Sequence, residues 1–249
     1  MTVAGRELPP SSPFAGDDGS CDPGLSAALE AYGRGDGSVT QVVTALAGTR
    51  VLVPVLAELE TADVVEVGDH RHTVDKEASA GIVALRAPDG RTALPVFSSV
   101  ASMAAWRPDA RPVPSDMARA ALSAVTEQWE LVVLDPGGPT TVLIGRPAVW
   151  ALAQQREWQP AVVRTQGGDA VDPRTRSAIG RAVGSVSGVL AADAVPGRRA
   201  EVAVVLTLMP GLDRTRLDVV LAHVNAALAA DETVTASVDS LELRLIAGP

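Results

Sequence analysis

The sequence predicts an α+β protein of two units, an N-terminal mixed or antiparallel sheet with flanking helices and a C-terminal ferredoxin-like βαββαβ unit. Its 249 residues are 47% hydrophobic and 20% charged, which is ordinary globular composition with enough chain for one or two domains. Residues 1–158 carry 12 basic and 20 acidic side chains, a net charge of −8. Residues 159–249 carry 9 and 10, a net charge of −1, so we place a boundary between the units at 158/159.

The first unit is expected at 22–158, after a Gly-, Pro- and Asp-rich flexible tail at 1–21. Asp22 before Pro23 predicts the start of a helix, and the capping-box spacing of Ser38 and Gln41 predicts the start of a second. Period-two patterns and turn dipeptides then predict strands at 51–56, 81–85, 92–97, 131–134 and 141–144. Further helices are expected after Ser98 or Ser99, after Ser115 or Asp116, and over 147–158.

The second unit is expected at 159–249, where the pattern is more regular. Strands are predicted at 161–164, 188–192, 202–208 and 241–245, and helices are predicted after Asp172 and after Asp213. The order is βαββαβ, which is typical of a ferredoxin-like split βαβ sheet with both helices on one face.

Four segments of the first unit resemble one known family. They are VLVPV at 51–55, ALPVFSS at 93–99 leading to a helix with Trp106, RPVP at 111–114, and LVVLDPGG at 131–138. Their order and spacing resemble the N-terminal domain of the SseB family, named for enhanced serine sensitivity, over about residues 25–158. The second unit stands where family members carry a C-terminal domain. The resemblance implies a bacterial cytoplasmic protein with a link to serine metabolism, and the family has no established activity that the resemblance would carry over to this chain.

Charge and residue inventory exclude several classes of function. A net charge of −9 and a pI of about 4.8 have the wrong sign for a nucleic-acid-binding face. The longest apolar run, at 202–209, is much shorter than the ~20 residues that span a bilayer, so no membrane partner is expected. The single cysteine, Cys21, allows no disulfide within the chain and favours the cytoplasm. The only lysine, Lys76, follows no glycine-rich loop, and no cofactor is predicted.

A ligand-binding site is one interpretation of the residues that follow two predicted strands. An aspartate beside glycines at a strand end could bind an amine, and nearby serines offer hydroxyl groups. The residues concerned are Phe97, Ser98, Ser99, Asp135, Gly137 and Gly138. The plainer alternative is a tight turn at 135–138 and a serine helix cap. No residue is assigned a catalytic role, because no general base can be placed beside either serine.

A metal site is a second hypothesis. His70 and His72 have the spacing of two ligands on one side of a strand, with Asp69, Asp75 and Glu77 nearby. The alternative is a solvated, charged loop. The four tryptophans, at 106, 129, 150 and 158, are interpreted mainly as core residues and alternatively as anchors for a partner.

The sequence therefore favours a non-catalytic cytoplasmic binding or regulatory module whose partner is a protein or a small molecule. One alternative is an amino-acid sensor, in which the second unit pairs edge to edge in a homodimer and binds serine at the seam. A less favoured alternative is a metal-assisted hydrolase acting through His70 and His72.

Overall fold

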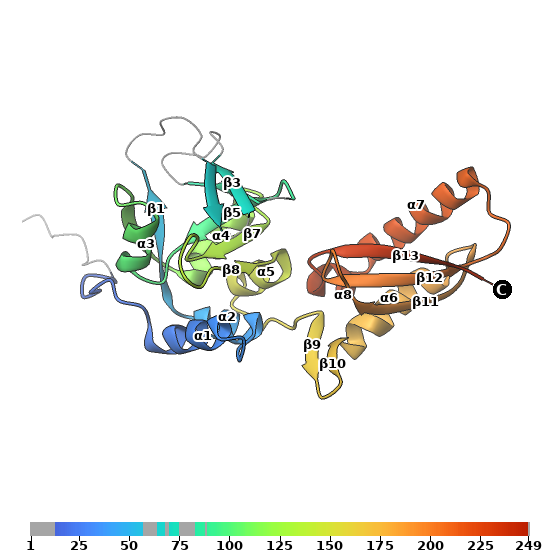
Figure 1. The fold of residues 1–249 in the computed structure, drawn as a ribbon, viewed down its shortest axis with the longest axis horizontal. Helices are drawn as coiled ribbons and strands as arrows, with labels where there is room; N and C mark the ends of the chain where they lie inside the picture. The colour runs from blue at the N-terminus through green and yellow to red at the C-terminus, as the bar shows by residue number, and fades with distance from the viewer. Residues whose placement is uncertain (1–12, 57–63, 68–69, 75–82, 88, 249) are drawn as a thin grey trace, which may run out of the picture. The chain divides into compact units, whose positions relative to one another are not determined.

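The structure, a computed structural model, describes residues 13–56, 64–67, 70–74, 83–87 and 89–248, without the side chains of 64–67 and 70–74. Contacts divide the chain into two compact units, Met1–Leu143 and Ile144–Pro249 (Figure 1). Helices and strands occur in both, which confirms the α+β class. None of the helices in the described ranges is long and apolar enough to cross a membrane.

The first unit contains two paired helices, two further helices and most of the strands of the larger sheet. Its helices are α1 (Pro23–Gly33), α2 (Val39–Leu46), α3 (Val100–Trp106) and α4 (Met117–Thr126). Its strands are β1 (Arg50–Val55), β2 (Val64–Val67), β3 (His70–Val74), β4 (Leu85–Arg86), β5 (Thr92–Val96), β6 (Arg111–Asp116) and β7 (Leu131–Leu134), and β8 (Val142–Ile144) spans the division between the units.

Local signals explain where the first helices begin. The Asp22 carboxylate accepts hydrogen bonds from the backbone N–H groups of Gly24 and Leu25, at 2.8 and 3.0 Å. Ser38 and Gln41 form the expected capping box at the start of α2. Both helix starts are confirmed.

A six-stranded sheet, in the order β2-β3-β4-β5-β7-β8, is the largest sheet of the structure, and all its strands except the end of β8 belong to the first unit. Strands β4 and β5 are antiparallel around Gly90, whose φ of +86° suits the predicted turn. Strands β5 and β7 are parallel, so their carboxyl ends meet at one edge. This edge positions the polar cluster described below.

The RPVP segment at 111–114 is part of a strand, although the sequence predicted no strand there. It lies within β6, which pairs antiparallel with β1 and sets Pro54 opposite Pro112. Proline removes one ladder donor, and it is tolerated because β1 and β6 form a sheet of only two strands. Strand β1 also meets Phe97 through an isolated bridge at Leu52.

The second unit contains a three-stranded sheet with helices and a separate hairpin. Its helices are α5 (Arg146–Ala153), α6 (Pro173–Gly184), α7 (Arg214–Ala230) and α8 (Glu232–Ser237). Its strands are β9 (Val162–Thr165), β10 (Gly168–Val171), β11 (Val189–Pro196), β12 (Val202–Leu208) and β13 (Leu241–Ala247). Helix α5 is shorter than the predicted 147–158, and β10 and α8 were not predicted.

The ferredoxin-like arrangement is not confirmed. A split βαβ sheet needs another strand between its two parallel strands. Here β12 pairs directly with β13 in parallel, from Val202↔Leu241 to Leu208↔Ala247. Strand β9 pairs with β10 in a hairpin of its own, so the sheet has the order β11-β12-β13. The predicted order of strands and helices is close to the observed order. That order does not determine which strands become neighbours in a sheet.

Alternation along β12 separates the two faces of this sheet. One hydrophobic cluster joins Val202, Val204, Leu206 and Leu208 to buried residues of both α6 and α7, including Ile179 and Val224. These four strand residues share one face. Helices α6 and α7 therefore cover the same face, and the period-two pattern predicted for this strand is confirmed.

Candidate functional site

A buried serine–aspartate pair joins the ends of the two parallel strands. Asp135 directly follows β7, and Ser98 lies two residues beyond β5. The Ser98 backbone N–H donates to Asp135 Oδ1 at 2.8 Å, and Ser98 Oγ donates to Oδ2 at 2.6 Å. Ser98 is 4% exposed and Asp135 is 6% exposed. Each carboxylate oxygen thus accepts a hydrogen bond from the same serine.

The Asp135 backbone is held in the left-handed region, with φ of +49°. Its carbonyl accepts from Gly138 N–H at 3.1 Å, closing the turn, and from Thr141 Oγ1 at 2.9 Å. Gly137 has φ of +72°, as the third position of a type II turn requires. Aspartate tolerates this backbone better than most residues, so the DPGG sequence suits the turn.

Burial governs the electrostatics of this cluster. Desolvation raises the pKa of Asp135, and the hydrogen bonds from Ser98 only partly oppose that effect. Desolvation also raises the pKa of the Cys21 thiol, which lies close enough for Asp135 to disfavour its thiolate further. Cys21 is therefore poorly suited to act as a nucleophile at neutral pH.

The neighbouring serines serve the start of α3. Ser99 Oγ accepts the N–H of Ser102 at 3.0 Å and caps the helix. The Ser102 hydroxyl lies 2.8 Å from Ser99 Oγ and 3.3 Å from Ser98 Oγ. The capping role expected of a serine at this point is confirmed for Ser99.

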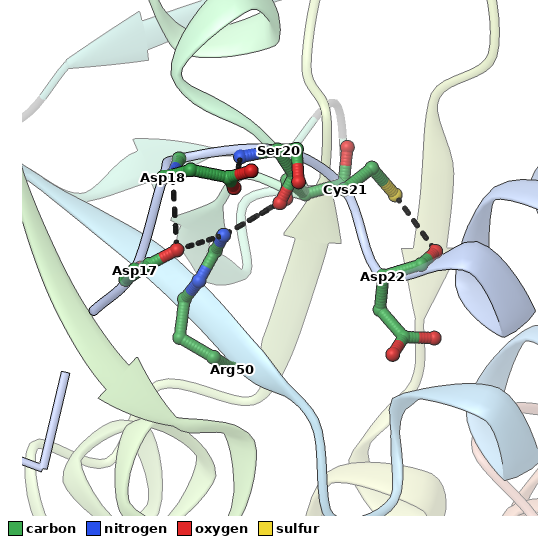
Figure 2. Close-up of polar contacts among 8 residues, drawn as sticks. Asp17, Asp18, Ser20, Cys21, Asp22 and Arg50 are labelled. Atoms are coloured by element: carbon green, nitrogen blue, oxygen red, sulfur yellow. Dashed lines mark hydrogen bonds and ion pairs between the residues drawn. The ribbon is translucent and has the colours of Figure 1, made fainter.

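Residues 17–20 lie against the same cluster, although the composition of 1–21 predicted a flexible tail. The carbonyl of Gly19 accepts the N–H of Val100 at 2.9 Å. Arg50 Nη2 donates to Asp17 Oδ1 at 2.7 Å and to the Ser20 carbonyl at 2.6 Å, as Figure 2 shows. Arg50 Nη1 also donates to the carbonyl of Ser98 at 3.0 Å. One arginine on β1 thus ties this segment to the serine–aspartate pair.

The structure places the remaining predicted site residues as follows. Phe97 is fully buried, and its ring centroid lies 5.2 Å from that of Trp106. Gly137 and Gly138 belong to the turn. His70 and His72 lie on β3, but their side chains and the carboxylates at 69, 75 and 77 fall outside the described residues. Among the residues whose side chains the structure describes, no group of three or more His, Cys, Asp and Glu is arranged to hold a metal ion.

Sequence reasoning brought Ser98 and Asp135 into one site but missed Arg50 and Cys21. The parallel pairing of β5 and β7 could have suggested the first contact, because parallel strands end at one edge. Nothing local indicated Arg50, which is separated from its partners by 30 to 48 positions.

A pocket of about 420 Å³ lies within the second unit, between α5 and α8. Two tryptophans and two arginines line it, Trp150, Trp158, Arg146 and Arg156, together with Glu157. Trp150 is 45% exposed, which contradicts a role in core packing and fits an anchor for a partner. The indole N–H of Trp158 is buried without an acceptor among the described residues.

Arg146 fixes the geometry of that pocket. Its backbone N–H donates to Asp239 Oδ1 at 2.9 Å, and its Nη2 donates to the Thr235 carbonyl at 3.1 Å. A Cβ on Gly145 would lie 2.7 Å from the Asp239 carboxyl carbon, so a larger residue here would displace the Asp239 side chain from this contact. Helix α5 is thereby held against the end of α8.

The first unit matches a known protein family. Residues 25–151 match the model of the SseB protein N-terminal domain. No curated protein sequence matches the chain. The matched range includes Arg50, Ser98 and Asp135 and begins after residues 17–21.

Proposed function

This chain belongs to the SseB family, and we propose that it acts in the cytoplasm as a non-catalytic binding and regulatory module. The pocket between α5 and α8 is the binding site in this proposal. The observation that carries it is Trp150, a large aromatic side chain left 45% exposed beside a second tryptophan and two arginines. Tryptophan and arginine are the residues most enriched where binding energy concentrates.

The serine–aspartate cluster is assigned a structural role. Ser98 and Asp135 are buried, and each carboxylate oxygen already accepts a hydrogen bond. A serine nucleophile needs a base that takes its proton and an approach for the substrate. Here the partner carboxylate holds two strand ends together, and the cluster supports the fold on which binding depends.

The lining of the pocket indicates the chemistry of its partner. Arg146 and Arg156 against Glu157 leave a net positive charge in a protein of net charge −9. The volume lies within the about 300–1,000 Å³ of ordinary ligand pockets. We infer a protein segment that places an aromatic side chain on Trp150 and an adjacent carboxylate near the arginines.

Fluorine NMR of the full chain labelled with 5-fluorotryptophan tests this proposal, since the four tryptophans give four assignable signals. The probe is the capped peptide Ac-Asp-Phe-Glu-NH₂. We expect the Trp150 and Trp158 signals to shift together while those of Trp106 and Trp129 stay in place. Trp150→Ala should weaken binding about tenfold or more.

Val219→Ala is the matched control, because this exposed apolar side chain lies on α7 and outside the pocket. Absence of any shift at Trp150 up to millimolar peptide, or equal shifts of all four signals, refutes the proposal. A shift produced by L-serine and not by the peptide would replace it with an amino-acid sensor.

A further inference from the structure

Strand β13 ends the second sheet with a free edge. Among the strands that the structure describes, it pairs only with β12, and Figure 1 shows it at the margin of the sheet. An unpaired strand edge offers a row of backbone donors and acceptors to another chain. The seven residues of β13 include no proline, lysine or bulge that would prevent such pairing.

The opposite edge of the sheet is protected. Strand β11 has a register irregularity between Val189 and Ala191 and ends at Pro196, which has no N–H to donate. Bulges and prolines are the usual means by which proteins block edge pairing. Only one edge of this sheet therefore remains suited to adding a strand.

The helical layer leaves the apolar face of β13 incompletely covered. Leu241, Leu243 and Leu245 pair with Val202, Val204 and Leu206, so they share the helix-covered face. Leu243 packs against the core of the unit, whereas Leu241 and Leu245 are 37% and 44% exposed. Leu241 and Leu245 thus lie on either side of the strand centre, on the face where apolar side chains of another chain could bury them.

The charges of β13 are complementary to the same strand running in the opposite direction. In a two-fold antiparallel pair centred on Leu243, Leu241 faces Leu245 of the second copy and Glu242 faces Arg244 of the second copy. Centring the pair on Glu242 or Arg244 would place like charges opposite each other, which destabilises a sheet. Among the three registers centred on residues 242 to 244, only the one centred on Leu243 therefore sets opposite charges against each other.

We propose that the second unit forms a homodimer through antiparallel pairing of β13 with β13 of a second copy, centred on Leu243. The two sheets join into one continuous sheet, with a leucine stripe on the helix side and two Glu242–Arg244 pairs on the other. Glu242 and Arg244 also contact each other within one chain, which gives four alternating charges across the seam. This contact does not use the pocket between α5 and α8.

Light scattering after size exclusion of the full chain should give twice the monomer mass of 25.6 kDa at about 100 µM. Arg244→Glu and Glu242→Arg each place like charges opposite in the homodimer, and each should raise its dissociation constant about tenfold. An equimolar mixture of the two variants should restore the dimer, since every opposed pair is then of opposite charge. Arg174→Glu on α6 makes the same charge change away from the seam and should leave the dimer intact.

Glu242 also accepts hydrogen bonds from the N–H groups of Arg198 and Arg199, so a second pair of variants avoids that contact. Leu241→Lys and Leu245→Glu change exposed residues, and each alone should weaken the dimer. Their mixture should recover it, because the new lysine faces the new glutamate across the seam. A monomeric wild type at about 100 µM, or mixtures that dissociate as readily as the single variants, would overturn the proposal.

Discussion

Replacement of Asp135 measures how much the serine–aspartate pair contributes to the stability of the first unit. Asp135→Ala removes both acceptors of Ser98, and hydrogen bonds to a charged group contribute about 1.5–3 kcal/mol each. Alanine at φ of +49° adds about 1 kcal/mol. Part of the loss is recovered because Ser98 Oγ lies 3.3 Å from Ser102 Oγ. We expect a net loss of about 4 kcal/mol in the free energy of unfolding.

Two further substitutions separate the contributions. Asp135→Asn keeps an acceptor for the Ser98 N–H, and asparagine tolerates the positive φ at this position. It also avoids burying a charge, so the free energy of unfolding should fall by only about 1–2 kcal/mol. Asp135→Gly removes the backbone cost and should be about 1 kcal/mol milder than alanine. Urea denaturation followed by tryptophan fluorescence, with the two units fitted as separate transitions, gives these values. Exposed Glu127→Ala is the control. Equal losses for asparagine and alanine would refute the structural role assigned to this carboxylate.

Three further outcomes are expected. Glu242 has its pKa lowered to about 2, chiefly by the backbone N–H of Arg198, so its contribution to stability should be present above pH 4.5 and lost as the pH falls toward 2. Acid denaturation of Glu242→Gln should lack that dependence, and an unchanged profile would contradict the assignment. Arg50→Ala should speed hydrogen exchange of the Val100 amide about tenfold, with Arg119→Ala as an exposed control. Ser38→Ala should cost about 1 kcal/mol by calorimetry, and no loss would show that its cap is dispensable.

Local chemistry explains why many elements of the first unit were predictable. The aspartate and proline at 22–23 and the capping box at 38–41 act within four residues, so they determine the helix starts whatever packs around them. The turn at 135–138 is also determined locally, because its proline and glycine adopt the backbone angles that the turn requires.

Strand neighbours were predicted less well, because pairing depends on contacts distant in sequence. Segment 111–114 has no local strand signal apart from its prolines, which favour an extended backbone. It forms a strand because it pairs with β1. The ferredoxin-like arrangement failed for the same reason. Both arrangements share one order of elements, and they differ in which strands pair: β12 pairs directly with β13, while β9 pairs with β10.

The candidate sites also combine features that the sequence indicated with features that depend on distant contacts. Sequence singled out Ser98 and Asp135 and named Trp150 and Trp158 as alternative partner anchors. It could not assign exposure, since burial depends on which helix covers a side chain, and so it favoured the core for a tryptophan that is 45% exposed. The arginines at 50 and 146 act across 30 or more positions, and no local pattern indicates such contacts.

The sequence by itself determined the helix starts, the turns, the alternation of β12 and the family of this chain, because these depend on neighbouring residues or on a matched order of segments. Tertiary structure alone decided that Ser98 and Asp135 are buried together and that Trp150 is exposed. It also decided that, among the strands the structure describes, β13 pairs only with β12. Each of these follows from which surfaces the folded chain covers, and covering a surface requires residues that the sequence keeps far apart.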